Sequence, residues 1–283
     1  MPPRTTTTAR QRRLGYELRK LRQRAGLSAT EAGKQLGLDQ SRISNIEAAR
    51  FGISADRVRT FAYNYGCADS SYIDALAAMT TSRRKDWWDE YASTLPSGLL
   101  DLAETEHHAS AIETAQTTHL PGLLQTVDYA RSVFRQSIPS LPPPQVEFRV
   151  SHRIKRQDLL YRDAPVPYRA VIHEAALRMQ FGGAAVTREQ LAHILDMSER
   201  EHITILVIPF TAGAFPGAGQ SVLYAHGPVP QLDTVQLDSE HGSLFLEAEG
   251  QLEKYRTFMR EFESVAVDDH ASRSIIRHVM ESL

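Results

Sequence analysis

The apolar positions of the first eighty residues recur at a helical spacing and are separated by short polar turns. Leu14, Leu18 and Leu21 follow one another at intervals of three or four residues, which predicts a helix over residues 9–25. Four further helices, each begun by a capping Ser or Asp, are predicted over residues 28–36, 39–47, 54–65 and 69–79. The pattern therefore predicts a mainly α N-terminal domain of five helices.

The rest of the chain alternates between helical and strand-like patterns. The β-branched run ITILVI at residues 203–208 predicts a central strand. Apolar residues alternate over residues 166–173, and Pro167 predicts that this strand starts at an edge. Strands are also predicted over 221–225, 234–237 and 243–246, and helices near 99–108, 123–134, 146–160, 174–181, 187–195, 248–263 and 269–282. We therefore expect an α+β C-terminal domain.

Polar, unperiodic stretches predict the domain boundaries. Residues 80–85 contain no apolar position and end the helical pattern of the first domain. Residues 1–8 are rich in Thr and have no apolar periodicity, which is typical of a disordered arm. The expected organisation is an arm over 1–8, a helical domain over 9–79, a linker over 80–94 and a second domain over 95–283.

The third predicted helix has two contrasting faces. Ile43, Ile46 and Glu47 fall on the face that is expected to point inward. Amides bond adenine bidentately, Arg does so with guanine, and Ser bonds bases or phosphates. Side chains of these kinds occupy the outward positions, which are Gln40, Ser41, Arg42, Ser44 and Asn45. The pattern therefore predicts a helix that reads the major groove of DNA.

Charge is divided unevenly along the chain. Residues 1–60 hold 13 Lys and Arg against 5 Asp and Glu, a net of +8, whereas the remaining residues hold 19 against 29, a net of −10. This division fits a nucleic-acid-binding domain joined to a domain with another task. Lys34 and Arg50 are expected to hold phosphates. The arginines near the N-terminus either follow the DNA backbone or are merely solvated: Arg4, Arg10, Arg12 and Arg13.

The N-terminal motifs are Leu18-Arg19-x-x-Arg22, Gly26-Leu27-Ser28-x-x-Glu31, Gly37-Leu38 and Ser41-x-Ile43-Ser44-x-Ile46-Glu47. They resemble the XRE-type helix-turn-helix of phage repressors and many bacterial regulators, in which the second helix of the pair enters the major groove. The resemblance implies base contacts by Gln40, Ser41 and Asn45, with Arg42 beside them. It therefore implies an XRE-type DNA-binding domain over residues 9–79.

The same resemblance bears on how the domain is held together and where it departs from its family. It implies an ion pair between Arg22 on the first helix and Glu47 at the end of the third. Gly33 stands where a small Ala is usual, and close helix packing explains a small residue there. Ala29 stands where the family often has a Gln that touches phosphate. Because one domain offers few base contacts, we expect a homodimer on a palindromic operator.

A second set of motifs covers the C-terminal part: Leu120-Pro-Gly-Leu-Leu-Gln-Thr-x-x-Tyr129-Ala130, Arg156-Gln157-x-Leu159, His173 to Arg178, Gln190-Leu191 and Ile203-x-x-Leu206-Val207-Ile208-Pro209-Phe210. It resembles actinobacterial XRE-type regulators of the WhiJ sort, which carry a large domain of unknown function. Their genes commonly neighbour one for a small companion protein, in pairs that resemble antitoxin–toxin systems. The resemblance implies a transcriptional regulator that is controlled through its second domain.

Two roles for the second domain stay open. It binds a small companion protein, or it senses a small molecule held between helices and sheet near Phe210 or Phe215. An enzyme is not expected, because the chain has no nucleophile elbow and no cofactor fingerprint. We therefore expect no catalytic residues and no cofactor. The segment 104–108, ETEHH, is not expected to bind metal, because adjacent His side chains diverge on a helix.

Other patterns have ordinary interpretations. The basic residues Arg149, Arg153, Lys155 and Arg156 are expected to form a solvated face with acidic neighbours rather than a second nucleic-acid patch. No apolar run approaches the ~18 residues of a membrane span, and the N-terminus has no signal-peptide pattern. We therefore expect a cytoplasmic, sequence-specific DNA-binding transcriptional regulator.

Overall fold

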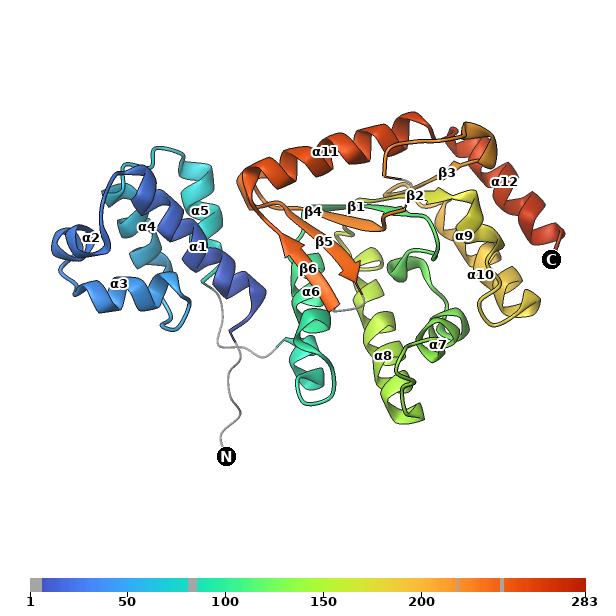
Figure 1. Cartoon of the computed structure of the whole chain (residues 1–283), viewed down its shortest axis with the longest axis horizontal. Helices are drawn as coiled ribbons and strands as arrows, with labels where there is room; N and C mark the ends of the chain where they lie inside the picture. Colours follow the sequence, from blue (N-terminus) through green and yellow to red (C-terminus); the bar gives the residue numbers. More distant parts are fainter. Residues whose placement is uncertain (1–6, 81–85, 218, 240–241) are drawn as a thin grey trace. The chain divides into compact units, whose positions relative to one another are not determined.

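The computed structural model describes residues 7–80, 86–217, 219–239 and 242–283. The chain divides into two compact units, Met1–Trp87 and Trp88–Leu283 (Figure 1). Residues 1–6 of the predicted arm and 81–85 of the predicted linker lie outside the described residues. The rest of that linker contains a short 3₁₀ helix, η1 (Trp87–Tyr91), in which Trp88 is buried with its ring 5.1 Å from that of His107.

The first unit contains the five predicted helices, which are confirmed. They are α1 (Ala9–Arg24), α2 (Ala29–Leu36), α3 (Gln40–Glu47), α4 (Ala55–Asn64) and α5 (Ser70–Ala78). Each begins after a Thr, Ser or Asp whose side chain accepts a hydrogen bond from a backbone N–H of the first turn. Leu18, Ile43, Phe61 and Leu76 are buried in the centre, so that α1, α3, α4 and α5 share one core.

Two buried charges also belong to this core. Glu17 on α1 is fully buried and accepts a 2.5 Å hydrogen bond from the Tyr72 hydroxyl. Its other oxygen lies 2.9 Å from the Nε of Arg13, which is itself buried. Arg13 is therefore a core residue, and the prediction that it is solvated or follows the DNA backbone is wrong.

The second unit is built on one mixed sheet. Its strand order is β3-β2-β1-β4-β5-β6, with β1 and β2 parallel, β2 and β3 parallel, and the other neighbours antiparallel. The strands are β1 (Ala111–Gln116), β2 (Tyr168–His173), β3 (Ile203–Ile208), β4 (Val222–His226), β5 (Thr234–Ser239) and β6 (Gly242–Leu246). The predicted α+β class of the C-terminal unit is therefore confirmed.

The positions predicted for two strands in the sheet are wrong. The ITILVI strand, β3, lies at an edge, and β2 lies between β3 and β1. The sequence of β3 is as apolar as that of a central strand because the edge of β3 that faces away from β2 is covered by other parts of the chain. The backbone N–H of Val207 donates to the Ser272 hydroxyl at 2.9 Å, and its carbonyl accepts from Val267 at 2.9 Å. Pro167 precedes β2, where it removes no sheet hydrogen bond.

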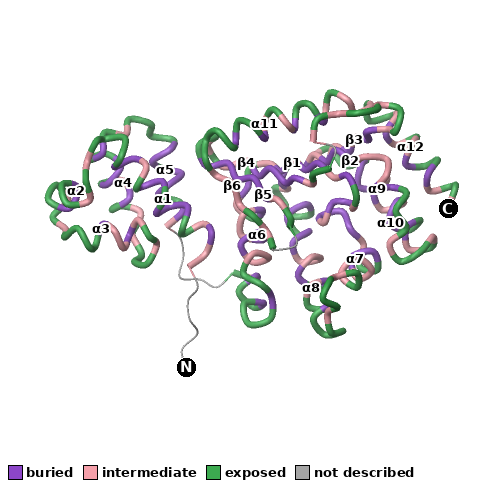
Figure 2. Tube along the Cα trace, viewed as in Figure 1, coloured by how far each residue is buried: buried purple, intermediate pink, exposed green. Residues whose placement is uncertain are grey.

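Helices cover both faces of the sheet (Figure 1). One face packs against α11 (Glu249–Ser264) through a core that includes Tyr224, Val235, Leu252 and Phe262. The core on the opposite face takes residues from α12 (Asp269–Glu281) and from four of the earlier α-helices. Buried and exposed positions alternate along α11 and α12 (Figure 2). The α-helices are α6 (Ser97–His107), α7 (Val127–Arg135), α8 (Pro143–Arg156), α9 (Glu174–Arg178), α10 (Ala184–Met197), α11 (Glu249–Ser264) and α12 (Asp269–Glu281). The further 3₁₀ helices are η2 (Gly122–Leu124), η3 (Gln157–Leu160), η4 (Phe210–Ala212) and η5 (Pro230–Leu232).

The basic run on α8 differs from its prediction. Arg156 is buried and donates two hydrogen bonds to the fully buried carboxylate of Glu106, at 2.7 and 2.5 Å. Arg153 donates to the Gln125 side chain at 2.5 Å and lies 4.3 Å from the centre of the Phe134 ring. The prediction of a solvated face is therefore wrong for these two residues, because α8 turns them toward the interior.

Candidate functional site

Local sequence signals determine the geometry of α2 and α3. Ser28 and Glu31 form a reciprocal capping box at the start of α2, and Gly37 ends that helix in the left-handed conformation. Asp39 then caps α3 through a 2.6 Å hydrogen bond from the Arg42 backbone N–H. A Cβ at Gly33 would lie 2.6 Å from the Leu38 carbonyl oxygen. The turn therefore excludes even Ala at position 33, because the chain folds back onto α2.

The ion-pair partners Arg22 and Glu47 lie in contact. Arg22 donates from Nε and Nη2 to the two Glu47 oxygens at 2.6 and 2.8 Å, and from Nη1 to the Leu27 carbonyl at 2.7 Å. The hydrogen bond to Glu47 raises the pKa of Arg22, so that the guanidinium stays charged. A Cβ at Gly15 would lie 2.5 Å from the Glu47 carbonyl oxygen. α1 and the loop before α2 therefore hold the end of α3 in place.

The outer face of α3 is open to solvent. Gln40, Ser41 and Arg42 are exposed, and Ser44 and Asn45 are half-buried. Within the helix, the Gln40 amide donates to the Ser44 hydroxyl at 3.3 Å and the Asn45 amide to that of Ser41 at 3.4 Å. These hydrogen bonds are long, so exchanging them for base or phosphate partners costs little.

The cationic residues expected at phosphates lie beside this helix. Lys34 is exposed on α2, and Arg50 is exposed in the loop after α3. That loop is anchored by hydrogen bonds from the backbone N–H groups of Arg50 and Phe51 to the Asn45 carbonyl, at 2.8 and 3.2 Å. The Arg42 guanidinium lies 5.9 Å from the centre of the Phe51 ring. The turn between α2 and α3 and the anchored loop after α3 therefore fix the backbone positions of Lys34, Gln40, Arg42, Asn45 and Arg50 relative to one another.

The turn after α3 contains a strained residue. Ala49 has a φ of 55° and is the one non-glycine residue with positive φ among the described residues. We expect Ala49→Gly to raise the free energy of unfolding of the first unit by about 1 kcal/mol, because glycine relieves the left-handed strain. Ala48→Gly is the matched control, since Ala48 has a φ of −85°. It should lower stability by about 0.5–1 kcal/mol. Urea denaturation measures both, and equal effects of the two substitutions would contradict the expectation.

Two family models match the chain. A model described as a helix-turn-helix domain matches residues 13–71. A model described as a domain of unknown function, DUF5753, matches residues 99–278, which is more than half of the chain. The chain belongs to the DUF5753 family. Searches among curated proteins and among solved structures returned no match.

The two matches agree with the expected combination of a helix-turn-helix and a large domain of unknown function. The helix-turn-helix domain indicates a DNA-binding regulator of transcription rather than an enzyme. The DUF5753 domain has no assigned activity, so its role rests on its own residues. Among the described residues, no helix has both the length and the apolar character that crossing a membrane requires.

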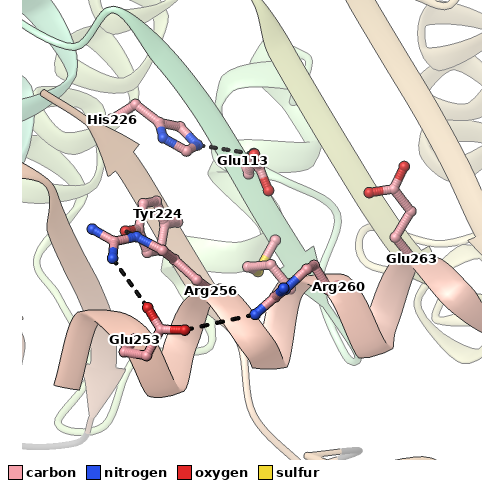
Figure 3. A pocket seen from close by; sticks show the side chains of 8 residues that line it. Glu113, Tyr224, His226, Glu253, Arg256, Arg260 and Glu263 are labelled. Atoms are coloured by element: carbon pink, nitrogen blue, oxygen red, sulfur yellow. Dashed lines mark hydrogen bonds and ion pairs between the residues drawn. The ribbon is translucent and has the colours of Figure 1, made fainter. Parts of the chain in front are cut away.

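The DUF5753 domain contains a cavity of about 420 Å³ between α11 and the sheet (Figure 3). Glu113 of β1 and Tyr224 and His226 of β4 line it from the sheet. Glu253, Arg256, Met259, Arg260 and Glu263 line it from α11. This cavity does not include Phe210 or Phe215, near which a small-molecule site is predicted from the sequence, so that location stays a prediction. Phe210 is exposed on η4, and the Phe215 ring lies 5.1 Å from the ring of Phe262.

The sequence did not reveal these residues as a group. Residues 111–116, AIETAQ, contain two β-branched residues, Ile112 and Thr114, among Ala, Glu and Gln, which do not favour strands, so the segment does not predict the strand that carries Glu113. The segment 104–108, for which a metal site was not expected, is divided between two environments. Glu106 pairs with Arg156, whereas the His107 and His108 rings lie 5.1 and 6.4 Å from that of Trp88. Within the described ranges, no three His, Cys, Asp or Glu side chains gather as metal ligands would.

An ion pair on the cavity wall responds to pH. His226 Nε2 and Glu113 Oε1 are 2.9 Å apart. This hydrogen bond raises the pKa of His226 above 6.5 and lowers the pKa of Glu113 below 4.5. The His226 contribution to stability is therefore complete below pH 6.5 and is lost as pH rises through the folded-state pKa. The Glu113 contribution to stability is complete above pH 4.5 and is lost as pH falls through the folded-state pKa of Glu113.

We expect His226→Gln to destabilise the DUF5753 domain most at about pH 5.5, by up to ~1 kcal/mol, because the pair is partly exposed. The difference from the wild type should shrink toward pH 9, where His226 is neutral in both states. Urea denaturation at pH 5.5, 7 and 9 measures this difference. Glu113→Gln is the matching variant and should follow the same trend. A difference that is constant with pH would contradict the assignment.

Proposed function

We propose that this protein is a cytoplasmic, sequence-specific transcriptional regulator of the XRE type. The exposed polar face of α3 carries the proposal, because its fixed inner face leaves Gln40, Ser41, Arg42, Ser44 and Asn45 toward solvent. In this proposal those side chains read bases, and Lys34 and Arg50 hold phosphates. Residues 9–79 are the DNA-binding domain, and residues 95–283 regulate it.

Homodimer formation on a palindromic operator is part of the proposal. One domain of this size presents a single short helix to the groove, and two-fold pairing doubles the number of base contacts. The second part of the proposal is that the DUF5753 domain binds a small companion protein encoded by a neighbouring gene, in an antitoxin-like pair. The net charge of −10 beyond residue 60 supports a role for that domain other than DNA binding.

Base reading is tested by alanine substitution on α3. Asn45→Ala and Gln40→Ala should each weaken binding to operator DNA by about 1–3 kcal/mol and leave binding to random DNA unchanged. Lys34→Ala and Arg50→Ala should weaken both equally and each reduce the salt slope by about one. Asn64→Ala, at an exposed position on α4, is the control for a surface amide.

The operator is first obtained by genomic footprinting of the tagged protein, with and without the neighbouring small gene. Discrete palindromic peaks that change when the neighbour is deleted support the companion-protein role. Equal losses on operator and random DNA for Asn45→Ala and Gln40→Ala would overturn the base-reading assignment. Peaks that are indifferent to the neighbouring gene would instead favour a small-molecule signal, for which the cavity beside α11 is the relevant observation.

A further inference from the structure

The cavity beside α11 contains charged groups that differ in how fully they are engaged. Arg256 donates to the Tyr224 hydroxyl at 2.8 Å, to Asp233 at 3.0 Å and to the Pro230 carbonyl at 3.1 Å. Tyr224 in turn donates to Asp233 at 2.6 Å. Because these partners occupy its guanidinium, Arg256 is a fixed part of the wall and not the group that a ligand would engage first.

Glu113 is the carboxylate that remains available on the sheet side. Its Oε1 accepts from His226, and its Oε2 accepts no hydrogen bond from the residues that the structure describes. The side chain lies on a strand with neighbours on both sides, so its position is set by the sheet. Glu263 differs, because its carboxylate already pairs with Arg169 at 2.5 Å.

Arg260 is the available cation on the helix side. It is 70% exposed, donates to the Thr257 hydroxyl at 3.1 Å, and lies 3.7 Å from Glu253. Its guanidinium lies on the side of the cavity formed by α11, across from Glu113 on the sheet (Figure 3). Held by one neutral partner and one distant carboxylate, it can exchange these for a ligand anion.

Two further lining residues offer apolar or aromatic surface. Met259 and the Tyr224 ring are buried and form part of the cavity. A thioether and an aromatic ring both contact apolar or aromatic groups favourably. A volume of about 420 Å³ lies within the range of small-molecule sites.

We infer that this cavity binds a small zwitterion of the amino-acid class. Its ammonium group lies at the free oxygen of Glu113, its carboxylate at Arg260, and its apolar side chain against Met259 and the Tyr224 ring. A site with opposite charges on its two sides favours a ligand that carries both, because an analogue that lacks one charge makes no charge-assisted hydrogen bond to Glu113 or to Arg260. The inference goes beyond the proposed companion protein by giving the DUF5753 domain a small-molecule ligand, and it rests on the proposed regulator only for its biological role.

The test uses the full chain without DNA. Thermal shift with each of the twenty L-amino acids at 10 mM identifies the compound that raises the unfolding temperature most, and calorimetric titration gives its Kd. The decarboxylated and the deaminated analogues of that amino acid are then titrated. Each is expected to bind at least about tenfold more weakly than the amino acid. Absence of binding by all twenty, or equal binding of either analogue, would overturn the inference.

Substitutions locate the site. Glu113→Gln and Arg260→Gln should each weaken the Kd at least about tenfold, and circular dichroism melts establish that both variants are folded. Arg188→Gln, at an exposed arginine of α10 outside the cavity, should leave the Kd unchanged. A Kd that is unaffected by both Glu113→Gln and Arg260→Gln would overturn the inference. Operator binding is measured separately, so its loss would contradict the proposed function without affecting the result for this cavity.

Discussion

Replacing Glu106 by Gln is expected to lower the free energy of unfolding of the DUF5753 domain by about 3–5 kcal/mol. The Glu106 and Arg156 side chains are 0% and 5% exposed and form two hydrogen bonds with each other. Without the carboxylate, Arg156 is a buried cation next to the half-buried cation Arg153. Burial and the charge of Arg156 already lower the pKa of Arg153 to about 9. The loss therefore removes the hydrogen-bonded carboxylate of a desolvated charge, which the Asp238 carboxylate then offsets only through space.

Two further variants distinguish the loss of the buried ion pair from a general loss of stability on substitution. The double variant Glu106→Leu with Arg156→Met removes both charges and should recover most of the lost stability, because a buried pair often contributes little more than apolar residues of similar size. Glu90→Gln breaks the exposed Lys155–Glu90 pair, whose atoms are 2.8 Å apart, and should cost at most about 1 kcal/mol. A Glu106→Gln variant as stable as Glu90→Gln in urea would contradict the prediction.

The second large effect is expected in the DNA-binding unit, at Glu17. Glu17→Gln should lower the free energy of unfolding of that unit by about 3–5 kcal/mol, since the buried Arg13 and the Lys20 ammonium, 3.4 Å from the other Glu17 oxygen, then lose the charge of this carboxylate. Tyr72 also loses its charged acceptor. Burial and the Glu17 carboxylate raise the pKa of Tyr72, so its hydroxyl remains a donor at every physiological pH.

Hydrogen exchange, measured separately on peptides from each unit, shows in which unit Glu17→Gln lowers stability. Peptides of α1, α3 and α5 should exchange much faster in Glu17→Gln, and peptides of β1 and β2 should not change. Asp74→Asn is the control, because it breaks the exposed Arg59–Asp74 pair at 3.0 Å. Faster exchange throughout the chain would contradict the assignment of Glu17 to the first unit alone. Unchanged exchange in α1 would contradict the stabilising role of its carboxylate.

Local signals predicted the first unit well. Ser28, Gly37 and Asp39 act through their own backbone or through residues three or four positions away. The local sequence is therefore enough to predict where α2 ends and where both helices begin. The two faces of α3 follow from the helical period in the same way. The base-reading roles of its outer residues remain predictions, because they concern a partner that is not part of the chain.

Long-range pairing limited the prediction of the second unit. The strand β1 was missed because Ala, Glu and Gln favour helices when they are considered alone, and only its pairing with β2 and β4 makes it a strand. The edge and interior positions predicted for β2 and β3 are the reverse of those observed. The Ser272 hydroxyl, which bonds the outer edge of β3, lies 65 residues further along the chain, so no local pattern indicates it. The cavity residues come from β1, β4 and α11, which no local pattern connects.

The separation of the two faces of α3 bears on how such a protein changes over evolutionary time. The packing of the helix depends on Ile43, Ile46 and the Glu47 pair with Arg22, whereas Gln40, Ser41 and Arg42 contribute little to it. Substitutions at these three outer positions therefore leave the fold nearly as stable as before. After a gene duplication, one copy can acquire a new DNA target through a few neutral steps at those positions while its DUF5753 domain is inherited unchanged.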